Sequence, residues 1–113
     1  MATLNRITLI GNLGTDPEIR QLNSGSKVAQ LTLATNENYK NSKGELVEQT
    51  EWHRIELWDA PAIFSEKYLK KGDSLYVEGK LRSEKWTDSS GQERQGWKVR
   101  ATSIQKLSKS AQS

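Results

Sequence analysis

Two tryptophans and an arginine, Trp52, Arg54 and Trp58, occupy even-numbered positions of one short segment that also carries Glu56. In a β-strand these positions lie on one face, because successive side chains alternate between faces. Flat indole rings stack on other flat rings, and a guanidinium binds anions. The pattern indicates a surface for a ligand with rings and negative charge. The alternative is that the rings cover a second core or a subunit interface, since Trp in a strand is more often packed than exposed. The opposite face would point to the core and carries His53, Ile55 and Leu57.

Catalytic chemistry has few candidates in this chain. His53 is the only histidine and there is no cysteine, which excludes a two-histidine metal site, a Cys-His dyad and disulfides. Glu51, Glu56 and Glu78 occupy positions typical of solvated strands. Gly11–Gly14 lacks the Lys-Ser/Thr of a phosphate-binding loop and follows a strand rather than joining two helices. The sequence therefore predicts no enzyme, no metal and no cofactor. A small hydrolase or nuclease is the alternative from another class.

Further aromatic and basic residues extend the predicted binding surface. Tyr39 and Trp86 add two candidate stacking platforms, and Lys43, Arg82 and Lys85 join Arg54 as candidate phosphate contacts. Proteins that bind single-stranded nucleic acid combine a basic groove with such rings, and each stacked base contributes about 1–3 kcal/mol. The net charge of +3 is only a mild basic excess, so the aromatic residues carry more weight in this prediction.

The length of 113 residues suits one domain, and no apolar run is long enough to span a membrane or resembles a signal peptide. Alternation and turn residues predict strands over 5–11, 18–22, 28–35, 52–58, 75–82 and 97–102. Residues 36–48 are predicted to be a loop or hairpin with its tip at 41–44. A helix is predicted over Asp59–Lys71, with Asp59 as N-cap, Pro61 in the first turn and Gly72 as the C′ residue.

This order predicts an all-β fold with one short helix between the third and fourth long strands. Five strands with that helix and extended β-hairpin loops match the OB-fold, a Greek-key barrel whose face and loops bind oligonucleotides. A generic α+β sheet has the same order of elements and remains the alternative. The expected domain covers residues 1–107, and residues 108–113 are predicted to form a short, polar, disordered tail.

Six motifs in this order and spacing resemble the bacterial single-stranded DNA-binding protein, the homotetrameric type also found in mitochondria and some phages. The resemblance covers about Asn5 to Ile104. The motifs are Asn5–Gly14 with Asp16-Pro17-Glu18, Leu31–Asn36, Glu48–Ile55, Tyr68–Gly72, Tyr76–Arg82, and Lys85–Asp88 with Gly91. The resemblance implies binding and protection of single-stranded DNA, without strong sequence preference, during DNA replication, recombination and repair. An accessory primosome protein or an RNA-binding OB-fold is the related alternative.

The resemblance also assigns roles by position. It places the stacking aromatics at Tyr39, Trp52, Trp58 and Trp86, although the family usually carries Trp at position 39 and Phe at position 58. Glu84 stands where a basic residue is common. His53 and Tyr76 match subunit-interface positions of a homotetramer. The basic positions that the resemblance adds or supports are Arg20, Arg54, Lys70, Lys71, Arg82, Lys85 and Arg94.

The resemblance finally implies partners and location. The partners are single-stranded DNA and three further copies of the chain, with no membrane, in the nucleoid-associated cytoplasm of a bacterium. Family members usually end in an acidic tip that recruits replication and repair proteins. Because residues 108–113 include no acidic tip, such recruitment is not predicted.

Overall fold

The computed structural model describes residues 1–108. Its elements are β1 (Ile7–Leu13), β2 (Glu18–Gln21), β3 (Lys27–Lys40), β4 (Leu46–Trp58), α1 (Ala60–Tyr68), β5 (Ser74–Thr87) and β6 (Glu93–Ser108). Of the tail predicted for 108–113, Ser108 is the last residue of β6 and the rest lies outside the described residues. Within residues 1–108, no helix is long and apolar enough to cross a membrane.

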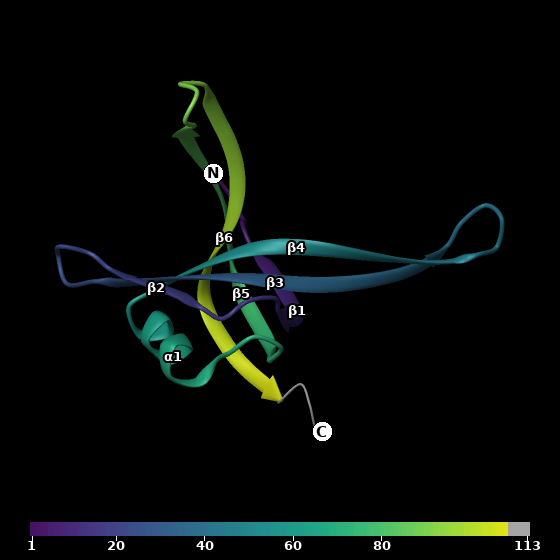
Figure 1. Cartoon of the computed structure of the whole chain (residues 1–113), viewed down its shortest axis with the longest axis horizontal. Helices are drawn as coiled ribbons and strands as arrows, with labels where there is room; N and C mark the ends of the chain where they lie inside the picture. Colours follow the sequence, from purple (N-terminus) through teal and green to yellow (C-terminus); the bar gives the residue numbers. More distant parts are fainter. Residues whose placement is uncertain (109–113) are drawn as a thin grey trace.

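The strands close into a barrel. They are ordered β1-β5-β6-β4-β3, and β1 returns to β3 through the pairs Asn12↔Ala34 and Leu13↔Leu33. The short β2 pairs with β3 outside this ring, and α1 lies between β4 and β5 in the chain (Figure 1). All pairings are antiparallel except β4 with β6, which meet in parallel at Ile55↔Val99 and Glu56↔Arg100. The predicted five-stranded OB-fold barrel with one helix is confirmed.

Two long hairpins extend beyond the barrel in different directions (Figure 1). The β3–β4 ribbon is paired from Val28↔Trp58 out to Lys40↔Leu46, and the β5–β6 ribbon reaches Thr87↔Glu93. The predicted extended hairpin with its tip at 41–44 is present, but the predicted strands end several residues too early. The physical reason is that the outer half of β3 is exposed on both faces, so it lacks the polar–apolar alternation that marks a half-buried strand.

The three hairpin tips share one geometry. In each, the N–H of the first residue donates to the carbonyl of the fifth residue. The carbonyl of the first residue accepts from the N–H of the fourth, which is a glycine with positive φ. The tips are 22–26, 41–45 and 88–92, with Gly25, Gly44 and Gly91 at φ 95°, 80° and 86°. No atom lies within 4 Å of where a Cβ would stand at any of them. Backbone conformation alone therefore requires glycine there.

The tip of the β5–β6 hairpin is held by the Asp88 carboxylate. It accepts hydrogen bonds from the Ser90 hydroxyl at 2.7 Å, from Arg94 Nε at 2.8 Å and from the Gln92 backbone N–H at 3.0 Å. These bonds lower the pKa of Asp88 to about 2. Because the folded pKa is depressed, the stabilisation of the tip is present above pH 4 and is lost as the pH falls towards 2.

We expect the Asp88 side-chain carboxyl carbon to titrate with a midpoint near pH 2 when followed by NMR. In Arg94→Gln the midpoint should rise, because one charge-assisted hydrogen bond to the carboxylate is removed. An ordinary midpoint near 3.8 in the unsubstituted chain would contradict this account of the tip.

The helix is shorter than predicted. It covers Ala60–Tyr68 rather than 59–71, because the next residue, Leu69, turns extended at φ −111° and ψ 145° and is buried in the core. Asp59 stands at the N-cap position, as predicted, but its side chain makes no capping hydrogen bond. Its carboxylate instead accepts from the Lys27 backbone N–H at 3.3 Å, tying the helix to the start of β3. Gly72 has φ 94° but lies in the following turn, not at C′.

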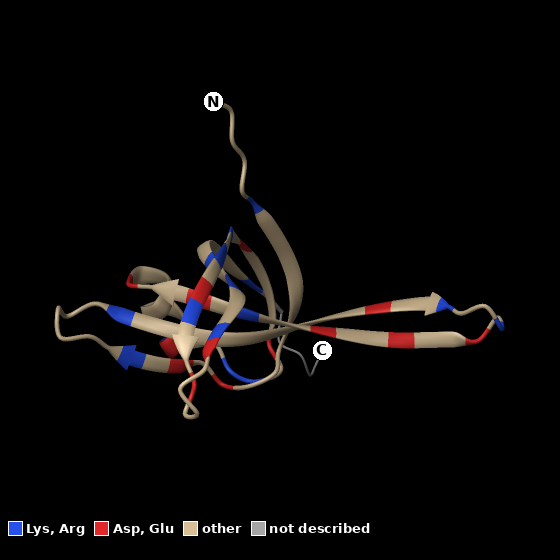
Figure 2. Cartoon of the chain, turned by 90° about the horizontal axis from the view of Figure 1, so that it is seen from above, with Lys and Arg blue, Asp and Glu red and all other residues tan. Residues whose placement is uncertain are grey.

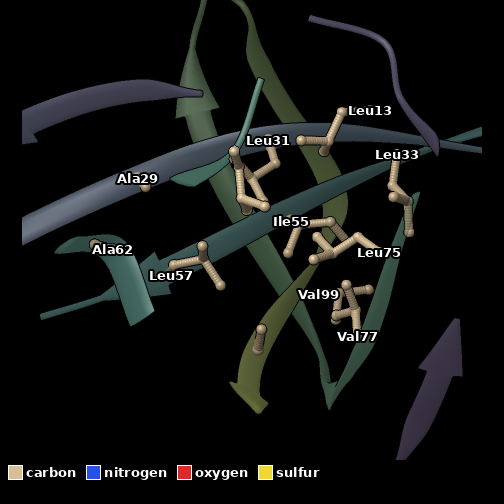
Figure 3. Close-up of a cluster of buried hydrophobic side chains, with 12 residues drawn as sticks. Leu13, Ala29, Leu31, Leu33, Ile55, Leu57, Ala62, Leu75, Val77 and Val99 are labelled. Atoms are coloured by element: carbon tan, nitrogen blue, oxygen red, sulfur yellow. The ribbon is translucent and has the colours of Figure 1, made fainter. Parts of the chain in front are cut away.

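The core fills the barrel from the inward faces of the strands, and α1 contributes Ala62 (Figure 3). The predicted alternation is confirmed, since Leu31 and Leu33 of β3 and Ile55 and Leu57 of β4 are buried. The complete cluster is Leu13, Ala29, Leu31, Leu33, Ile55, Leu57, Ala62, Leu69, Leu75, Val77, Val99 and Ala101.

Candidate nucleic-acid interface

The outward side chains of β4, β5 and β6 form one surface across three strands, because paired residues in a sheet share a face. Glu56 is paired with Arg100, Glu84 with Gly96, and Trp86 with Arg94. We call this surface the aromatic face. It consists of Trp52, Arg54, Glu56 and Trp58 on β4, Glu84 and Trp86 on β5, and Lys98 and Arg100 on β6.

Trp58 is half-buried and fixed on two sides. Its Nε1–H donates to Glu56 Oε1 at 2.9 Å, and the Arg100 guanidinium lies 5.0 Å from the ring centroid. A cation over an indole ring is attracted to its π-face. The ring is therefore held in one orientation before any ligand arrives.

Trp86 and Trp52 each pack against a glycine. The Trp86 ring lies 3.2 Å from where a Cβ would stand on Gly96, and the Arg54 guanidinium is 5.9 Å from its centroid. A Cβ on Gly14 would overlap the Trp52 ring, so this glycine leaves room for the indole. Trp52 and Trp86 nevertheless remain 57% and 43% exposed. Exposed rings supported on one side are suited to stacking on the other.

Tyr39 is not part of the aromatic face. It pairs with Val47, five positions along the ribbon from the Trp52–Ala34 pair, and it points from the opposite side of β3 and β4. That separation is about 17 Å at the rise of a β-strand. Tyr39 is 49% exposed and belongs to the projecting arm.

Two clefts border the aromatic face and share the Glu56–Lys98 ion pair as a common wall. One, of about 440 Å³, is lined by residues 15–18 together with Arg54 and Glu84. The other, of about 520 Å³, is lined by Trp58, Arg82 and Arg100 among others. The two clefts therefore adjoin each other at this ion pair on the barrel surface.

The cations of the face are largely paired with carboxylates. Arg54 pairs with Glu84, and Lys98 lies 2.7 Å from Glu56 and 3.5 Å from Glu84. Figure 2 shows Lys and Arg interspersed with Asp and Glu over the hairpins and barrel. The electrostatics of the face are therefore those of alternating charges rather than of an uninterrupted basic stripe.

Glu56 is the buried member of this network, with 8% exposure, whereas the sequence predicted a solvated position. Burial raises the pKa of Glu56, but hydrogen bonds from Lys98 and Trp58 and the charges of Lys98 and Arg100 outweigh it, so the net pKa is lowered. Parallel pairing of β4 with β6 causes the burial, because it places Arg100 beside Glu56.

The other predicted phosphate contacts are spread over several elements. Arg20 and Arg82 join the outer surface, through the pairs Arg20↔Val28↔Trp58 and Arg82↔Lys98. Arg94 is paired with Asp88 at 2.8 Å. Lys85 lies on the other side of its ribbon from Trp86. Lys70 and Lys71 follow α1, and the Lys71 backbone N–H donates to Asp16, which lines the first cleft, at 2.8 Å. Lys43 lies in the β3–β4 tip.

The sequence interpretation missed Trp97, Lys98 and Arg100 of β6. All three line the second cleft together with Trp58. The alternation of Lys98 and Arg100 about the buried Val99 was a signal that both point outward. Nothing in the sequence indicated that β6 lies beside β4.

The two predicted interface residues lie on different strands of the barrel, β4 and β5. His53 is half-buried on β4, with Nε2 2.9 Å from the Thr35 hydroxyl. Tyr76 lies on β5 opposite Ile10, a side chain that is 61% exposed. The Tyr76 hydroxyl donates to Glu78 Oε1 at 2.8 Å, and this bond raises the pKa of Tyr76.

A closed barrel with exposed rings on its third long strand and on its last hairpin defines an oligonucleotide-binding protein of the OB-fold class. The chain belongs to the single-strand binding protein family, whose model matches residues 4–107. The family is one of non-enzymatic proteins that bind single-stranded DNA.

Two solved structures are similar over most of this chain. A Plasmodium falciparum single-strand binding protein in complex with single-stranded DNA is 37% identical with a TM-score of 0.86, covering 96% of this chain and 98% of that one. A deletion mutant of the single-stranded DNA binding protein from Thermus aquaticus is 28% identical with a TM-score of 0.80. The match covers 93% of this chain and 51% of that one.

Proposed function

We propose that the aromatic face binds single-stranded DNA by stacking bases on Trp52, Trp58 and Trp86, with Tyr39 as a further platform on the β3–β4 arm. The observation that carries the proposal is that Trp52 and Trp86 are packed against Gly14 and Gly96 on one side yet remain about half exposed. Stacking is tolerant of sequence because every base has a π-face. The protein therefore coats and protects DNA without strong sequence preference during replication, recombination and repair.

The phosphates of the bound strand contact basic side chains around the rings. Arg54, Arg82 and Arg20 share the outer surface with the tryptophans, and Arg94 lies beside Trp86 in the hairpin. Lys43 in the β3–β4 tip and Lys85 on the other side of its ribbon would meet a strand only as it leaves the aromatic face. Lys70 and Lys71 lie near Asp16 at the edge of the first cleft. The similarity to the Plasmodium falciparum complex supports this use of the surface.

Titration with oligo-dT tests the proposal. We expect quenching of tryptophan fluorescence on binding, because bases stack directly on the indoles. The logarithm of the affinity should fall with the logarithm of salt concentration by about 0.7 for each phosphate contact. Unquenched fluorescence would contradict stacking, and equal affinity at low and high salt would contradict the phosphate contacts. Duplex DNA and RNA of equal length serve as competitors.

The proposal includes assembly as a homotetramer. β1 pairs with β5 along Ile7–Asn12 but with β3 only at Asn12 and Leu13, so within residues 1–108 the other edge of Ile7–Gly11 has no strand partner. Ile10 is exposed beside this edge, next to Tyr76. An open edge with an exposed apolar side chain is a natural site for pairing with another copy. We further propose a nucleoid-associated location in the bacterial cytoplasm.

Replacing His53 tests the assembly. Light scattering should give the mass of four chains for the unsubstituted protein at micromolar concentration. His53→Tyr should lower that mass, because a larger ring cannot occupy the half-buried place beside Thr35 without displacing its surroundings. A single-chain mass for the unsubstituted protein would refute the tetramer, and an unchanged mass for the variant would refute the interface role of His53.

A further inference from the structure

Glu84 lies between two cations of the aromatic face. Its Oε2 contacts Arg54 Nη2, and its Oε1 lies 3.5 Å from Lys98 Nζ. Lys98 also holds the buried carboxylate of Glu56 at 2.7 Å. Negative and positive side chains thus alternate in the order Glu56, Lys98, Glu84, Arg54. The guanidinium of the last one lies 5.9 Å from the centroid of the Trp86 ring.

A carboxylate offers a guanidinium the same kind of ligand as a phosphate, namely two anionic oxygens in a plane. The Arg54 side chain is 55% exposed and that of Glu84 is 29% exposed, so the pair lies within reach of a bound strand. Without DNA, Glu84 and Glu56 cancel the charges of Arg54 and Lys98. Of the cations on the aromatic face, Arg100 is left, and it lies over Trp58.

This arrangement has a consequence for the choice of ligand. A polyanion that exposes no bases gains little from a face whose cations are already paired. A single strand gains the stacking energy of its bases on the tryptophans, and that energy does not depend on the ion pairs. Accessible bases therefore contribute more to the binding free energy on this face than phosphate charges do.

We propose that Glu84 is a specificity-determining residue, which holds Arg54 and Lys98 in ion pairs and so favours single strands over duplexes and other polyanions. The inference rests on the proposed stacking of single-stranded DNA and adds the selection of the target. A duplex or another polyanion reaches Arg54 only by displacing Glu84, whereas a single strand stacks its bases whether or not this ion pair opens. Once displaced, the Glu84 carboxylate takes up a cation from solution, which offsets part of the cation release from the DNA.

The test compares Glu84→Gln with Glu93→Gln. Glu93 belongs to the same hairpin, and within residues 1–108 no ion pair involves it, so both variants lose one charge but only one frees Arg54. The affinities for oligo-dT, a duplex of equal length and heparin are measured over a range of salt. Glu84→Gln should bind duplex and heparin about 2- to 5-fold more tightly than Glu93→Gln does, with a smaller gain for oligo-dT. For the duplex, the slope of log affinity against log salt concentration should be steeper by about 0.9 than that of Glu93→Gln.

A double-mutant cycle tests whether Glu84 acts through Arg54. In the Arg54→Gln background, the gain in duplex affinity from Glu84→Gln should be smaller, because only the longer contact of Glu84 with Lys98 is left to release. An undiminished gain would show that Glu84 acts only by its overall charge and would overturn the proposal. Glu84→Asp keeps the negative charge on a shorter side chain, and its preference for single strands over duplex should lie between those of the unsubstituted chain and Glu84→Gln. It serves as the second variant if Glu84→Gln is unstable.

The outcomes separate this inference from the proposed function. If the unsubstituted chain binds oligo-dT with quenching but Glu84→Gln and Glu93→Gln show the same preference for single strands, the role of Glu84 fails alone. If the unsubstituted chain does not bind oligo-dT, the proposed function fails, and the inference fails with it.

Discussion

Trp86→Ala should weaken the binding of oligo-dT by about 1–3 kcal/mol, or about 5- to 150-fold. The substitution removes a ring that is 43% exposed and supported from behind by Gly96. It also removes the cation–π partner of Arg54, so within residues 1–108 the guanidinium keeps only its contact with Glu84. Fluorescence anisotropy of a labelled oligonucleotide at fixed salt measures the change.

Two variants make the result specific to stacking. Trp86→Phe keeps a π-face and should recover most of the affinity. Tyr68→Ala removes an aromatic side chain of 58% exposure on α1, remote from the aromatic face, and should leave the affinity unchanged. Equal losses in Trp86→Ala and Tyr68→Ala would show that the ring at position 86 has no special role.

Leu33→Ala should lower the free energy of unfolding by about 2–5 kcal/mol, a large part of the 5–15 kcal/mol typical of a domain. Leu33 is fully buried where β3 meets β1 through the pair with Leu13, so the cavity would open at the closure of the barrel. Urea denaturation at a fixed chain concentration measures the loss, because assembly makes stability depend on concentration.

Leu46→Ala is the matched control for this substitution. Leu46 is also a leucine in a strand, but it is 72% exposed near the end of the β3–β4 arm. Its truncation should change the free energy of unfolding by no more than about 0.5 kcal/mol. A loss at Leu33 as small as this would mean that the β1–β3 seam contributes little to the closure of the barrel.

The barrel was predictable because its core strands alternate. Leu31 and Leu33, and Ile55 and Leu57, are inward residues separated by outward polar or aromatic ones, and period-2 alternation marks a strand with one buried face. The hairpin arms were underpredicted for the same reason, since a ribbon exposed on both faces has no such alternation. The end of the helix depends on the burial of Leu69, a tertiary effect that local preferences do not contain.

The sequence predicted which residues of one strand share a face of the candidate site. It did not predict the contacts between residues of different strands. Alternation correctly placed Trp52, Arg54 and Trp58 on one face of β4. The neighbours of these residues depend on the pairing of β4 with β6, which joins segments more than forty residues apart. Consequently the contact of Arg100 with Trp58 and the pairing of Arg54 with Glu84 were not predictable from the sequence.

At the three hairpin tips, glycine is required because φ is positive and not because space is short. Gly25, Gly44 and Gly91 have positive φ, and no atom lies within 4 Å of an added Cβ. An L-residue is strained in this conformation, whereas its mirror image adopts it readily. A D-alanine at any tip is therefore compatible with the positive φ of the folded backbone and would restrict the unfolded chain. Chemical synthesis could in this way stiffen the arms without touching a single side chain of the aromatic face.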